Sequence, residues 1–423
     1  MKDSGIEWIG EIPEGWEVAP IRSCFDEVRT KNTNGQEQNA LQFKFGNIIS
    51  KTNFNANADD YVADAITNYT VVLPDTVMIN GLNLNYDFKS LRVALVKEKG
   101  VITSAYLAIF PDRKKISPQY ATYLFKGYET KMAFHNMGAG IRKTLGYKEF
   151  KNQPLLLPSE KEQNKISAYL DSKFSHIDIM LSKIRSSIEE YKKLKQAVIT
   201  QAVTKGVRGE REMKDSGVEW IGEIPKEWVC EKIKYATSIS RGLFNHRPRN
   251  DERYYNGKYP FIQTGDVANA TKYIVSYSQT LNELGKSVSK EFPKGTLTMT
   301  IAANVGDVAI LNFDAYFPDS VVGFVPNKNI RTLYLFYVFS AMKDEFIRTA
   351  IKSTQLNLNI DRVKETFIPV TLNVNEQCEI ENYLESKCAE IDGLIAKKEQ
   401  LVKELESYKK SLIYEVVTGK REV

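Results

Sequence analysis

Apolar residues recur every seven positions in two stretches of the chain, one within residues 158–212 and one within residues 373–423. This spacing puts them on one stripe of an α-helix, the seam along which coiled-coil helices pair. Lys195 and Lys409 interrupt equivalent positions of the seam, and such polar interruptions can fix the register of two helices. We expect the pairing residues to be Leu170, Ile177, Leu181, Ile184 and Ile188 in the first helix and Leu384, Ile391, Ile395, Val402 and Leu405 in the second.

Both helices have a recognisable start. Ser159 followed by Glu162 is the pattern of a capping box, and Asn373 followed by Glu376 is its counterpart. A helix of about 40 residues is roughly 60 Å long, and its apolar seam needs a partner. Residues 158–212 carry 11 basic and 8 acidic side chains, whereas residues 373–423 carry 8 basic and 11 acidic ones. The opposite charges favour pairing of the two helices with each other, and the connectivity favours an antiparallel pair with a globular part at each end.

Short apolar runs outside the helices predict strands followed by one helix in each half. In the first half we expect strands at 70–79, 91–96 and 101–110 and a helix at 118–136. In the second half we expect strands at 258–263, 296–302, 308–313 and 321–325 and a helix at 331–351. The predicted fold class is α+β, with two mixed α/β domains separated by two long antiparallel coiled-coil helices.

The two halves of the chain are copies of each other. Residues 1–16 and 213–228 are identical at 13 of 16 positions, and Glu162-Gln163 matches Glu376-Gln377 at the helix starts. Chance does not produce this, so we infer an internal duplication with pseudo-twofold symmetry. Residues 30–130 and 240–340 show no convincing identity. We therefore place domains at 1–157 and 213–372 and helices at 158–212 and 373–423. The ends of the two halves are alike and form a shared structural framework, whereas the two domains have diverged and are expected to recognise different targets.

Composition narrows the function classes without selecting one. The net charge of +5 over 423 residues is compatible with a polyanionic partner. The four cysteines form no C-x-x-C pair and the three histidines are far apart, so neither a metal site nor a redox motif is indicated. No apolar run reaches the roughly 18 residues of a membrane span, and the N-terminal residues lack a signal sequence. We therefore expect a cytoplasmic protein with no membrane partner.

Several loops combine amide, basic and aromatic side chains. Asn and Gln can read adenine, Arg can read guanine, and Lys and Arg can hold phosphates. The strongest cluster has four arginines within 13 residues, interleaved with Phe244, Tyr254 and Tyr255; for any single residue elsewhere, a solvated polar loop is the more common explanation. The candidate DNA-contacting residues are Asn83, Asn85, Arg142 and Lys143 in the first half and Arg241, Arg247, Arg249, Arg253, Gln355 and Asn357 in the second.

Motifs of catalysis are sparse. The sequence has no phosphate-binding G-x-x-x-x-G-K-[ST], no DPPY-type methyltransferase motif and no H-E-x-x-H. Pro111-Asp112 followed by Glu129-Thr130-Lys131 is similar to the PD…ExK pattern of metal-dependent nucleases. Glu129 and Lys131 lie two positions apart on a predicted helix and would point to different faces. We therefore expect a turn followed by a solvated helix there, with a nuclease as a minor alternative.

These features together resemble the specificity subunits of type I restriction–modification enzymes. Each half opens with G-x-E-W-I-G-E-I-P-x-x-W, at residues 5–16 and 217–228, and closes with a helix that begins E-Q-x-x-I. Further similarities are the segments 154–158, 261–267 and 300–310. The first half departs from the pattern, because it lacks a clear copy of Gln263-Thr264-Gly265-Asp266; Lys44-Phe45-Gly46-Asn47 is the candidate for that place.

The resemblance implies a function. Each target-recognition domain would read one half of a split, asymmetric site on double-stranded DNA, and the helices would set the gap and dock methyltransferase subunits. The implied partners are two methyltransferase and two restriction–motor subunits. The chain itself would be non-catalytic and bind no cofactor, with S-adenosylmethionine, ATP and Mg²⁺ on the partners. The alternative of another class is a coiled-coil scaffold with two protein-binding domains.

Overall fold

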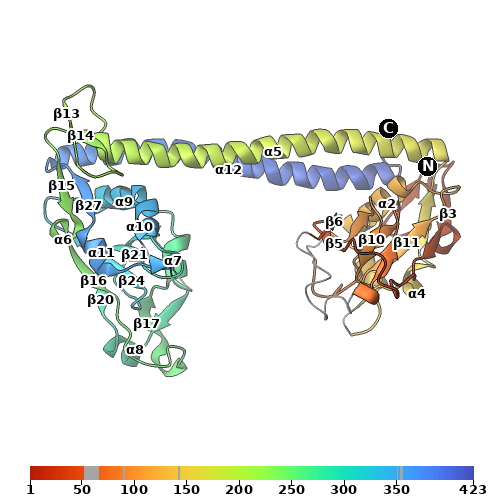
Figure 1. The fold of residues 1–423 in the computed structure, drawn as a ribbon, viewed down its shortest axis with the longest axis horizontal. Coiled ribbons are helices and arrows are strands. Elements are labelled where there is room, and N and C mark those ends of the chain that lie inside the picture. Colours follow the sequence, from red (N-terminus) through yellow and green to blue (C-terminus); the bar gives the residue numbers. More distant parts are fainter. Residues whose placement is uncertain (52–65, 89–90, 142, 350, 353–355) are drawn as a thin grey trace. The chain divides into compact units, whose positions relative to one another are not determined.

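The computed structural model (Figure 1) describes residues 1–51, 66–88, 91–141, 143–349, 351–352 and 356–423. It has a mixed α/β fold with two long helices, α5 (Glu160–Lys205) and α12 (Val374–Val417). The chain divides into two compact units, the first formed by residues 1–185 with 399–423 and the second by residues 186–398. Each unit therefore contains a segment of both long helices.

The two helix starts use the predicted caps. The Ser159 backbone N–H donates to Glu162 Oε2 (3.2 Å) and the Glu162 N–H donates to Ser159 Oγ (3.4 Å), which makes a capping box. At α12 the Asn373 side-chain oxygen accepts hydrogen bonds from the N–H groups of Asn375 (3.1 Å) and Glu376 (3.3 Å). The Glu376 carboxylate turns toward other partners, so the second start has the cap without the reciprocal contact.

In the first unit the segments of α5 and α12 contact each other and run antiparallel. Lys409 Nζ lies 2.7 Å from an Asp178 carboxylate oxygen, and Arg185 forms an ion pair with Glu406 at 2.6 Å. The residue numbers rise along α5 while those of the partners fall along α12, which gives the direction.

The second unit repeats this arrangement. Lys195 forms an ion pair with Asp392 at 2.6 Å, and Lys398 lies 5.4 Å from the centre of the Tyr191 ring. Lys195 is the counterpart of Lys409 in the heptad pattern. Each lysine that interrupts the seam therefore reaches an aspartate of the facing helix within its own unit.

The globular part of the first unit holds a four-stranded antiparallel sheet of order β4-β11-β8-β9. Helix α2 packs against this sheet and buries Tyr120, Leu124 and Phe125 in the core. Strand β3 pairs with β12, the strand just before α5. The bounds are β1 Lys2–Asp3, β2 Glu11–Ile12, β3 Glu17–Pro20, η1 Ile21–Ser23, β4 Phe25–Glu27, β5 Leu41–Lys44, β6 Asn47–Ser50, β7 Thr70–Val72, β8 Val77–Ile79, β9 Val93–Leu95, β10 Gly100–Ile102, β11 Leu107–Pro111, α2 Pro118–Thr130, α3 Ala133–Met137, α4 Tyr147–Phe150 and β12 Pro154–Leu157.

Three predicted elements of the first unit are each split in two. The strand expected at 70–79 is β7 and β8, separated by a turn in which Asp75 has a left-handed φ of 74°. The strand expected at 101–110 is β10 and β11, separated by the turn at 103–106. The helix expected at 118–136 is α2 and α3, because Met132 has a φ of 53° that a right-handed helix cannot continue.

The second unit carries a five-stranded sheet of order β16-β24-β21-β22-β18 and a four-stranded sheet of order β19-β17-β23-β20. Helix α9 packs on the five-stranded sheet, and β15 pairs with β27, the strand before α12. The bounds are β13 Met213–Asp215, β14 Glu223–Pro225, β15 Val229–Lys232, α6 Ile233–Ala236, β16 Thr237–Arg241, η2 Glu252–Tyr254, β17 Tyr255–Phe261, α7 Thr264–Asn269, β18 Tyr273–Ile274, β19 Gln279–Leu281, α8 Glu283–Ser287, β20 Glu291–Phe292, β21 Leu297–Thr300, β22 Val308–Leu311, β23 Ala315–Tyr316, β24 Val321–Pro326, α9 Thr332–Ala341, α10 Lys343–Thr349, β25 Ile351–Lys352, β26 Leu356–Asn357, α11 Ile360–Glu365 and β27 Phe367–Val370.

The four strands predicted in the second half are present as β17, β21, β22 and β24, with ends that differ by a few residues. The helix expected at 331–351 is α9 and α10, which meet at Met342. The sequence did not predict the other short strands, because runs of two to five residues are too short to show a period.

The same polar contacts attach the long helices to the globular parts of both units. Trp16 Nε1 donates to Glu162 (3.3 Å), and Trp228 Nε1 donates to Glu376 (3.1 Å). Further side chains repeat their hydrogen bonds 214 positions later in the chain. These matched pairs are Gln163 with Gln377, Tyr120 with Tyr334, and Tyr123 with Tyr337.

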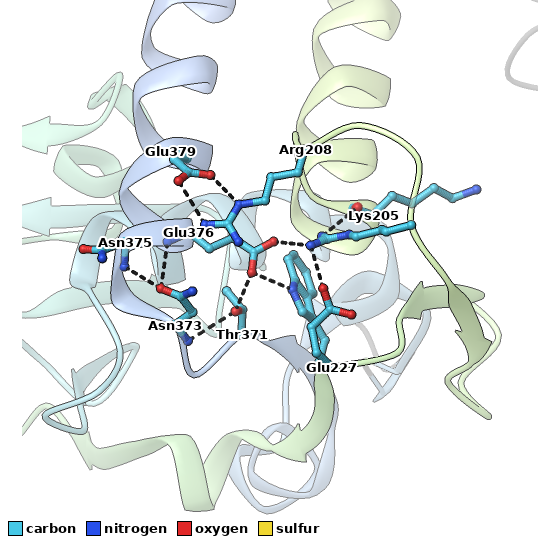
Figure 2. A network of polar contacts seen from close by, with 10 residues as sticks. Lys205, Arg208, Glu227, Thr371, Asn373, Asn375, Glu376 and Glu379 are labelled. Atoms are coloured by element: carbon cyan, nitrogen blue, oxygen red, sulfur yellow. Dashed lines mark hydrogen bonds and ion pairs between the residues drawn. The ribbon is translucent and has the colours of Figure 1, made fainter.

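The second unit adds an ion-pair network at the start of α12 (Figure 2). Arg208 forms two hydrogen bonds with Glu379, at 2.7 and 2.9 Å. Arg211 lies 2.6 Å from Glu376, whose side chain is only 1% exposed, and 3.1 Å from Glu227. The network ties residues 206–212, which follow α5, to the first turn of α12.

Candidate nucleic-acid interface

Three of the four arginines predicted for the second half converge on one aspartate. Arg241 ends β16, and its Nε donates to the Asp319 carbonyl oxygen at 2.5 Å. Arg249 forms an ion pair with the Asp319 carboxylate, and Arg247 lies 3.5 Å from the same carboxylate. Asp319 precedes β24, the strand that pairs with β16. Sheet pairing therefore brings the arginine loop and Asp319 together.

A glycine permits this close approach. A Cβ atom at Gly242 would lie 2.2 Å from the carbonyl oxygen of Pro318 and 2.4 Å from that of Phe317. Both distances are far below van der Waals contact, so a larger residue would push the loop away from the segment before β24. Gly242 thus fixes where the arginines lie.

The arginine cluster carries more positive charge than it neutralises internally. Arg241, Arg247 and Arg249 are exposed; Arg247 and Arg249 share the single Asp319 carboxylate, whereas Arg241 contacts the backbone carbonyl oxygen of Asp319. Guanidinium groups bind phosphate oxygens and the edge of guanine through paired N–H donors. The cluster is therefore chemically suited to a DNA backbone or a guanine.

Arg253, the fourth arginine, has a different environment. It bonds Asp251 through Nε and Nη2, at 3.0 and 2.7 Å. This hydrogen bonding holds the pKa of the Asp251 carboxyl well below its usual range. His246 also contacts Asp251, at 3.0 Å. The pair of Arg253 and Asp251 is locally neutral and stabilises the loop rather than adding free positive charge.

A pocket of about 270 Å³ lies beside the arginine cluster. Arg249, Gln263 and Gln279 line it with polar groups, and Phe244, Tyr255 and Phe261 line it with rings. Phe244 and Tyr255 are stacked, with ring centres 5.7 Å apart. Neither glutamine was among the site residues predicted from the sequence. Only the segment 261–267 pointed there, since Gln263 belongs to it.

The other two predicted residues of this half are placed only in part. Gln355 lies outside the described residues, and Asn357 ends β26 in the hairpin β25–β26. The next residue, Leu358, donates its N–H to Ile301 (2.9 Å), and Ile301 donates to Ser320 (3.0 Å). Because Ser320 follows Asp319, the hairpin lies at the same end of the sheet as the arginine cluster.

In the first unit the structure brings two separately predicted loops into contact. The Leu84 N–H, between Asn83 and Asn85, donates to the Lys143 carbonyl oxygen at 3.1 Å. Asn85 Nδ2 donates to the Ile141 carbonyl oxygen at 3.0 Å. Asn83 and Lys143 are exposed, whereas Arg142 lies outside the described residues. Of the candidate residues that the structure describes here, Asn83 and Lys143 therefore have exposed side chains, while Asn85 holds the loops together.

A buried arginine that was not predicted from the sequence supports the first of these loops. Arg92 is 1% exposed, and its guanidinium donates to the carbonyl oxygens of Asn80 (2.8 Å), Leu82 (2.9 Å) and Asp87 (2.6 Å). Its backbone N–H donates to Glu129 Oε1 at 2.5 Å. No local pattern marks a buried arginine that satisfies the carbonyls of a turn, so the sequence offered no signal for it.

The predicted seam residues lie on the inner sides of the long helices. Leu170, Ile177, Leu181, Ile188, Leu384 and Ile391 are at most 7% exposed. Ile184, Ile395, Val402 and Leu405 are half-buried. Six of the ten predicted seam residues are therefore buried and four are half-buried.

The residues of the nuclease-like pattern serve separate local contacts. Asp112 accepts a hydrogen bond from the Lys114 N–H and pairs with Lys115 at 3.3 Å. Glu129 is half-buried on α2, and burial raises its pKa to about 7. Lys131 Nζ lies 4.3 Å from the centre of the Tyr414 ring. The turn at Asp112 is present, but the expectation of a solvated helix was wrong, because α2 is a core helix.

The proposed first-half copy of the segment 263–266 has a different structure. Gln263 is the N-cap residue of α7, with its N–H bonded to Asp266 (2.8 Å). Lys44 and Asn47 instead flank a hairpin turn in which Phe45 and Gly46 have φ of 49° and 70°. A tight turn and a helix start are different backbone structures, so Lys44–Asn47 is not an equivalent of Gln263–Asp266.

Comparisons with known proteins find the family that the sequence resembles. Residues 239–404 match the family described as type I restriction modification DNA specificity domain. The putative type I restriction enzyme MjaX specificity subunit of Methanocaldococcus jannaschii is 24% identical, over 97% of this chain and 95% of its own length. The MjaVIII specificity subunit of the same organism is 23% identical, over 97% of this chain and 93% of its own length.

Solved structures share the fold. A chain from a structure titled for the assembly and conformational transition of the type I R-M system has a TM-score of 0.73 at 15% identity, and the match covers 97% of this chain and all of that one (100%). The HsdS subunit of Thermoanaerobacter tengcongensis has a TM-score of 0.52 at 14% identity, covering 97% and 98%. Among the described residues, no helix combines the length and apolarity that crossing a membrane requires. The chain is therefore similar to type I restriction–modification specificity subunits over nearly its whole length, and residues 239–404 match the model of that DNA specificity domain.

Proposed function

We propose that the chain gives a type I restriction–modification complex its DNA sequence specificity and carries out no chemistry itself. The observation that carries the proposal is the exposed cluster of Arg241, Arg247 and Arg249, anchored on Asp319 beside a pocket lined with amides. Cationic groups that position a phosphate backbone next to groups that read a base edge are the two parts that a sequence-specific DNA site needs.

Under this proposal the two halves read the two parts of a split site. The second unit would use the arginine cluster with Gln355 and Asn357, and the first would use Asn83 and Lys143 with Arg142. Antiparallel pairing of α5 with α12 along their length would set the gap between the two readers, as a pseudo-twofold duplication allows. Double-stranded DNA, two methyltransferase subunits and two restriction–motor subunits would complete the complex in the cytoplasm, and S-adenosylmethionine, ATP and Mg²⁺ would bind the partners.

The test is DNA binding by the chain assembled with its methyltransferase subunits. Arg241→Ala, Arg247→Ala and Arg249→Ala should each weaken binding, by roughly 1–3 kcal/mol where the side chain reads a base. Where it holds a phosphate, the slope of log K against log salt should fall by about 1. Arg185→Ala is the matched control, because Arg185 is exposed on α5 and pairs only with Glu406 among the described residues. If none of the three changes affinity, salt slope or methylated sequence relative to the control, the proposal fails.

The salt dependence of DNA binding also distinguishes the proposed function from the alternative of a protein-binding scaffold. Binding to DNA releases counterions, so the affinity should fall steeply with salt concentration. A scaffold that binds proteins has no reason to show a DNA affinity of this kind. A complex without salt-dependent, sequence-selective DNA binding would favour the scaffold.

A further inference from the structure

The pocket beside the arginine cluster presents two amide groups that act as one unit. Gln263 Nε2 donates to Gln279 Oε1 at 2.9 Å. Gln263 Oε1 and Gln279 Nε2 have no protein partner among the described residues. Neither atom is fully buried, so both can contact a ligand. The pair therefore offers one acceptor and one donor to the pocket. Turning both amides over would exchange the two roles but would still leave one donor and one acceptor.

The backbone holds both glutamines in place. Gln279 begins β19, and its register partner in β17 is Phe261, two residues before Gln263. The Asp266 carboxylate accepts hydrogen bonds from the Gln263 N–H (2.8 Å) and the Ser278 N–H (3.2 Å). Asp266 thus clamps the residue before Gln279 to the start of α7. This pre-organisation removes part of the entropy cost of presenting two long side chains to a ligand.

The aromatic side of the pocket is closed to stacking. Phe244, Tyr255 and Phe261 are 3%, 8% and 2% exposed, so their rings offer almost no open face to a base that has left the helix. The amide pair, in contrast, is half-exposed. The pocket therefore suits the edge of a base that remains stacked in the duplex.

We propose that Gln263 and Gln279 together recognise an adenine, as the specificity-determining residues for one base pair of the half-site read by residues 213–372. This inference rests on the proposed DNA-reading function. In the major groove adenine presents a donor, N6, beside an acceptor, N7, which matches the acceptor and donor of the amide pair. Guanine presents two acceptors there, so one of them would face the free glutamine oxygen. Cytosine presents a single donor, and thymine an acceptor beside a methyl group.

Arg249 completes the arrangement. It lines the same pocket and is held by Asp319, which places a guanidinium next to the amide pair. A phosphate flanking the adenine is a group that this guanidinium can bind. The pocket therefore combines one positioning contact with one reading contact.

The experiment uses the chain assembled with its methyltransferase subunits. First, methylated sites are mapped in cells that carry the wild-type complex. Purified complexes are then titrated against four duplexes that differ only at one A·T pair of the second half-site, chosen so that it is not the methylated pair. The substitutions are Gln263→Met and Gln279→Met, which keep side-chain length but remove the hydrogen bonds. Gln279→Glu keeps the shape and replaces the free donor by an acceptor. Gln400→Met is the control, because Gln400 is exposed on α12 and its side chain bonds only Glu404 within the described part of the chain.

The wild-type complex should prefer adenine by roughly 5- to 150-fold, the range expected for one bidentate base contact. In Gln263→Met and Gln279→Met this preference should fall to about two-fold or less, with the first half-site unchanged. Gln279→Glu should lose the preference as well, and because it is isosteric its effect does not depend on packing. Gln400→Met should retain the wild-type preference.

Two results would overturn the inference while leaving the proposed function intact. One is a second half-site without any A·T pair apart from the methylated one. The other is an unchanged adenine preference in Gln279→Glu and in either methionine variant. A wild-type complex with no sequence-selective DNA binding at all would instead refute the proposed function on which the inference rests.

Discussion

Glu376 offers a sharp test of how the second unit is attached to α12. Its carboxylate is buried and accepts hydrogen bonds from Trp228 Nε1 (3.1 Å) and Thr371 Oγ1 (3.0 Å) and pairs with Arg211 at 2.6 Å (Figure 2). The substitution Glu376→Ala would leave the Trp228 indole N–H and the Thr371 hydroxyl without this acceptor, and Arg211 would lose its buried partner and keep the exposed Glu227. Glu162→Ala is the matched control, because Glu162 holds the same helix position in the first unit but is exposed.

The expected magnitudes differ clearly. Breaking one side of a buried ion pair costs about 3–5 kcal/mol, whereas loss of an exposed capping contact costs about 1–2 kcal/mol. For a unit of roughly 200 residues, 1 kcal/mol shifts the melting temperature by roughly 2–4 °C. Glu376→Ala should therefore lower the melting temperature of the second unit by about 6–20 °C. The shift of the first unit in Glu162→Ala should stay below about 8 °C.

The assay is thermal unfolding, detected by amide hydrogen exchange. Exchange of the β15 and β27 amides reports on the second unit alone. The double substitution Arg211→Met with Glu376→Ala should cost less than the sum of the single substitutions, since no buried charge remains unpaired. If Glu376→Ala destabilises the second unit no more than Glu162→Ala destabilises the first, the buried ion pair does not attach the helix and the reasoning is wrong.

Three further outcomes are expected. Asp178→Lys should destabilise the first unit by about 0.5–1 kcal/mol in chemical denaturation, and Lys409→Asp in the same chain should restore most of the loss; no recovery would mean that the pair does not set helix register. Gly242→Ala should weaken DNA binding through displacement of the arginine loop, at a cost of roughly 1–3 kcal/mol, with circular dichroism confirming an intact fold; wild-type affinity would contradict the close approach. Burial raises the pKa of Glu129 to about 7, so the folded chain binds this proton more tightly than the unfolded chain. The free energy of unfolding should therefore fall as the pH rises from about 4.5 to 7, by roughly 3 kcal/mol at most. Glu129→Gln should flatten that part of the stability profile, and an unchanged profile would remove Glu129 as its cause.

The sequence predicted the long helices well because their signals are long. More than four heptads with a capping residue located the start of α5 correctly, although the predicted range 158–212 runs seven residues past the end of the helix at Lys205. The Trp–Glu contacts were not predicted; they recur in the segments repeated at 1–16 and 213–228. Shorter elements were predicted with the right type but the wrong ends. A single left-handed residue such as Asp75 or Met132 breaks an element, and a hydrophobic pattern carries no information about such a φ angle.

The sequence predicted the candidate site only where several residues of one suitable type lie close together in the chain. Four arginines in 13 residues marked the loop, but the reason that three of them converge is Asp319, which lies 70 positions after Arg249. The amide pair shows the same limit. Gln263 and Gln279 meet because β17 and β19 pair in a particular register, and sequence separation hides that contact. Arg92 was missed for a different reason, since a buried arginine on turn carbonyls leaves no local pattern.

The contacts that recur in both units and those that do not have different locations. Recurring contacts, such as Trp16 with Glu162 and Trp228 with Glu376, join the globular parts to the long helices. The loops that carry the candidate DNA contacts are instead held by interactions that differ between the units. In the first unit the Arg92 guanidinium donates to backbone carbonyl oxygens of the loop, and in the second Asp319 pairs with arginines of the loop. Because each device is local, a substitution at a loop tip leaves the helix attachments untouched. The frame can therefore stay constant while the loops change, which is the property that a pair of independently evolving DNA readers requires.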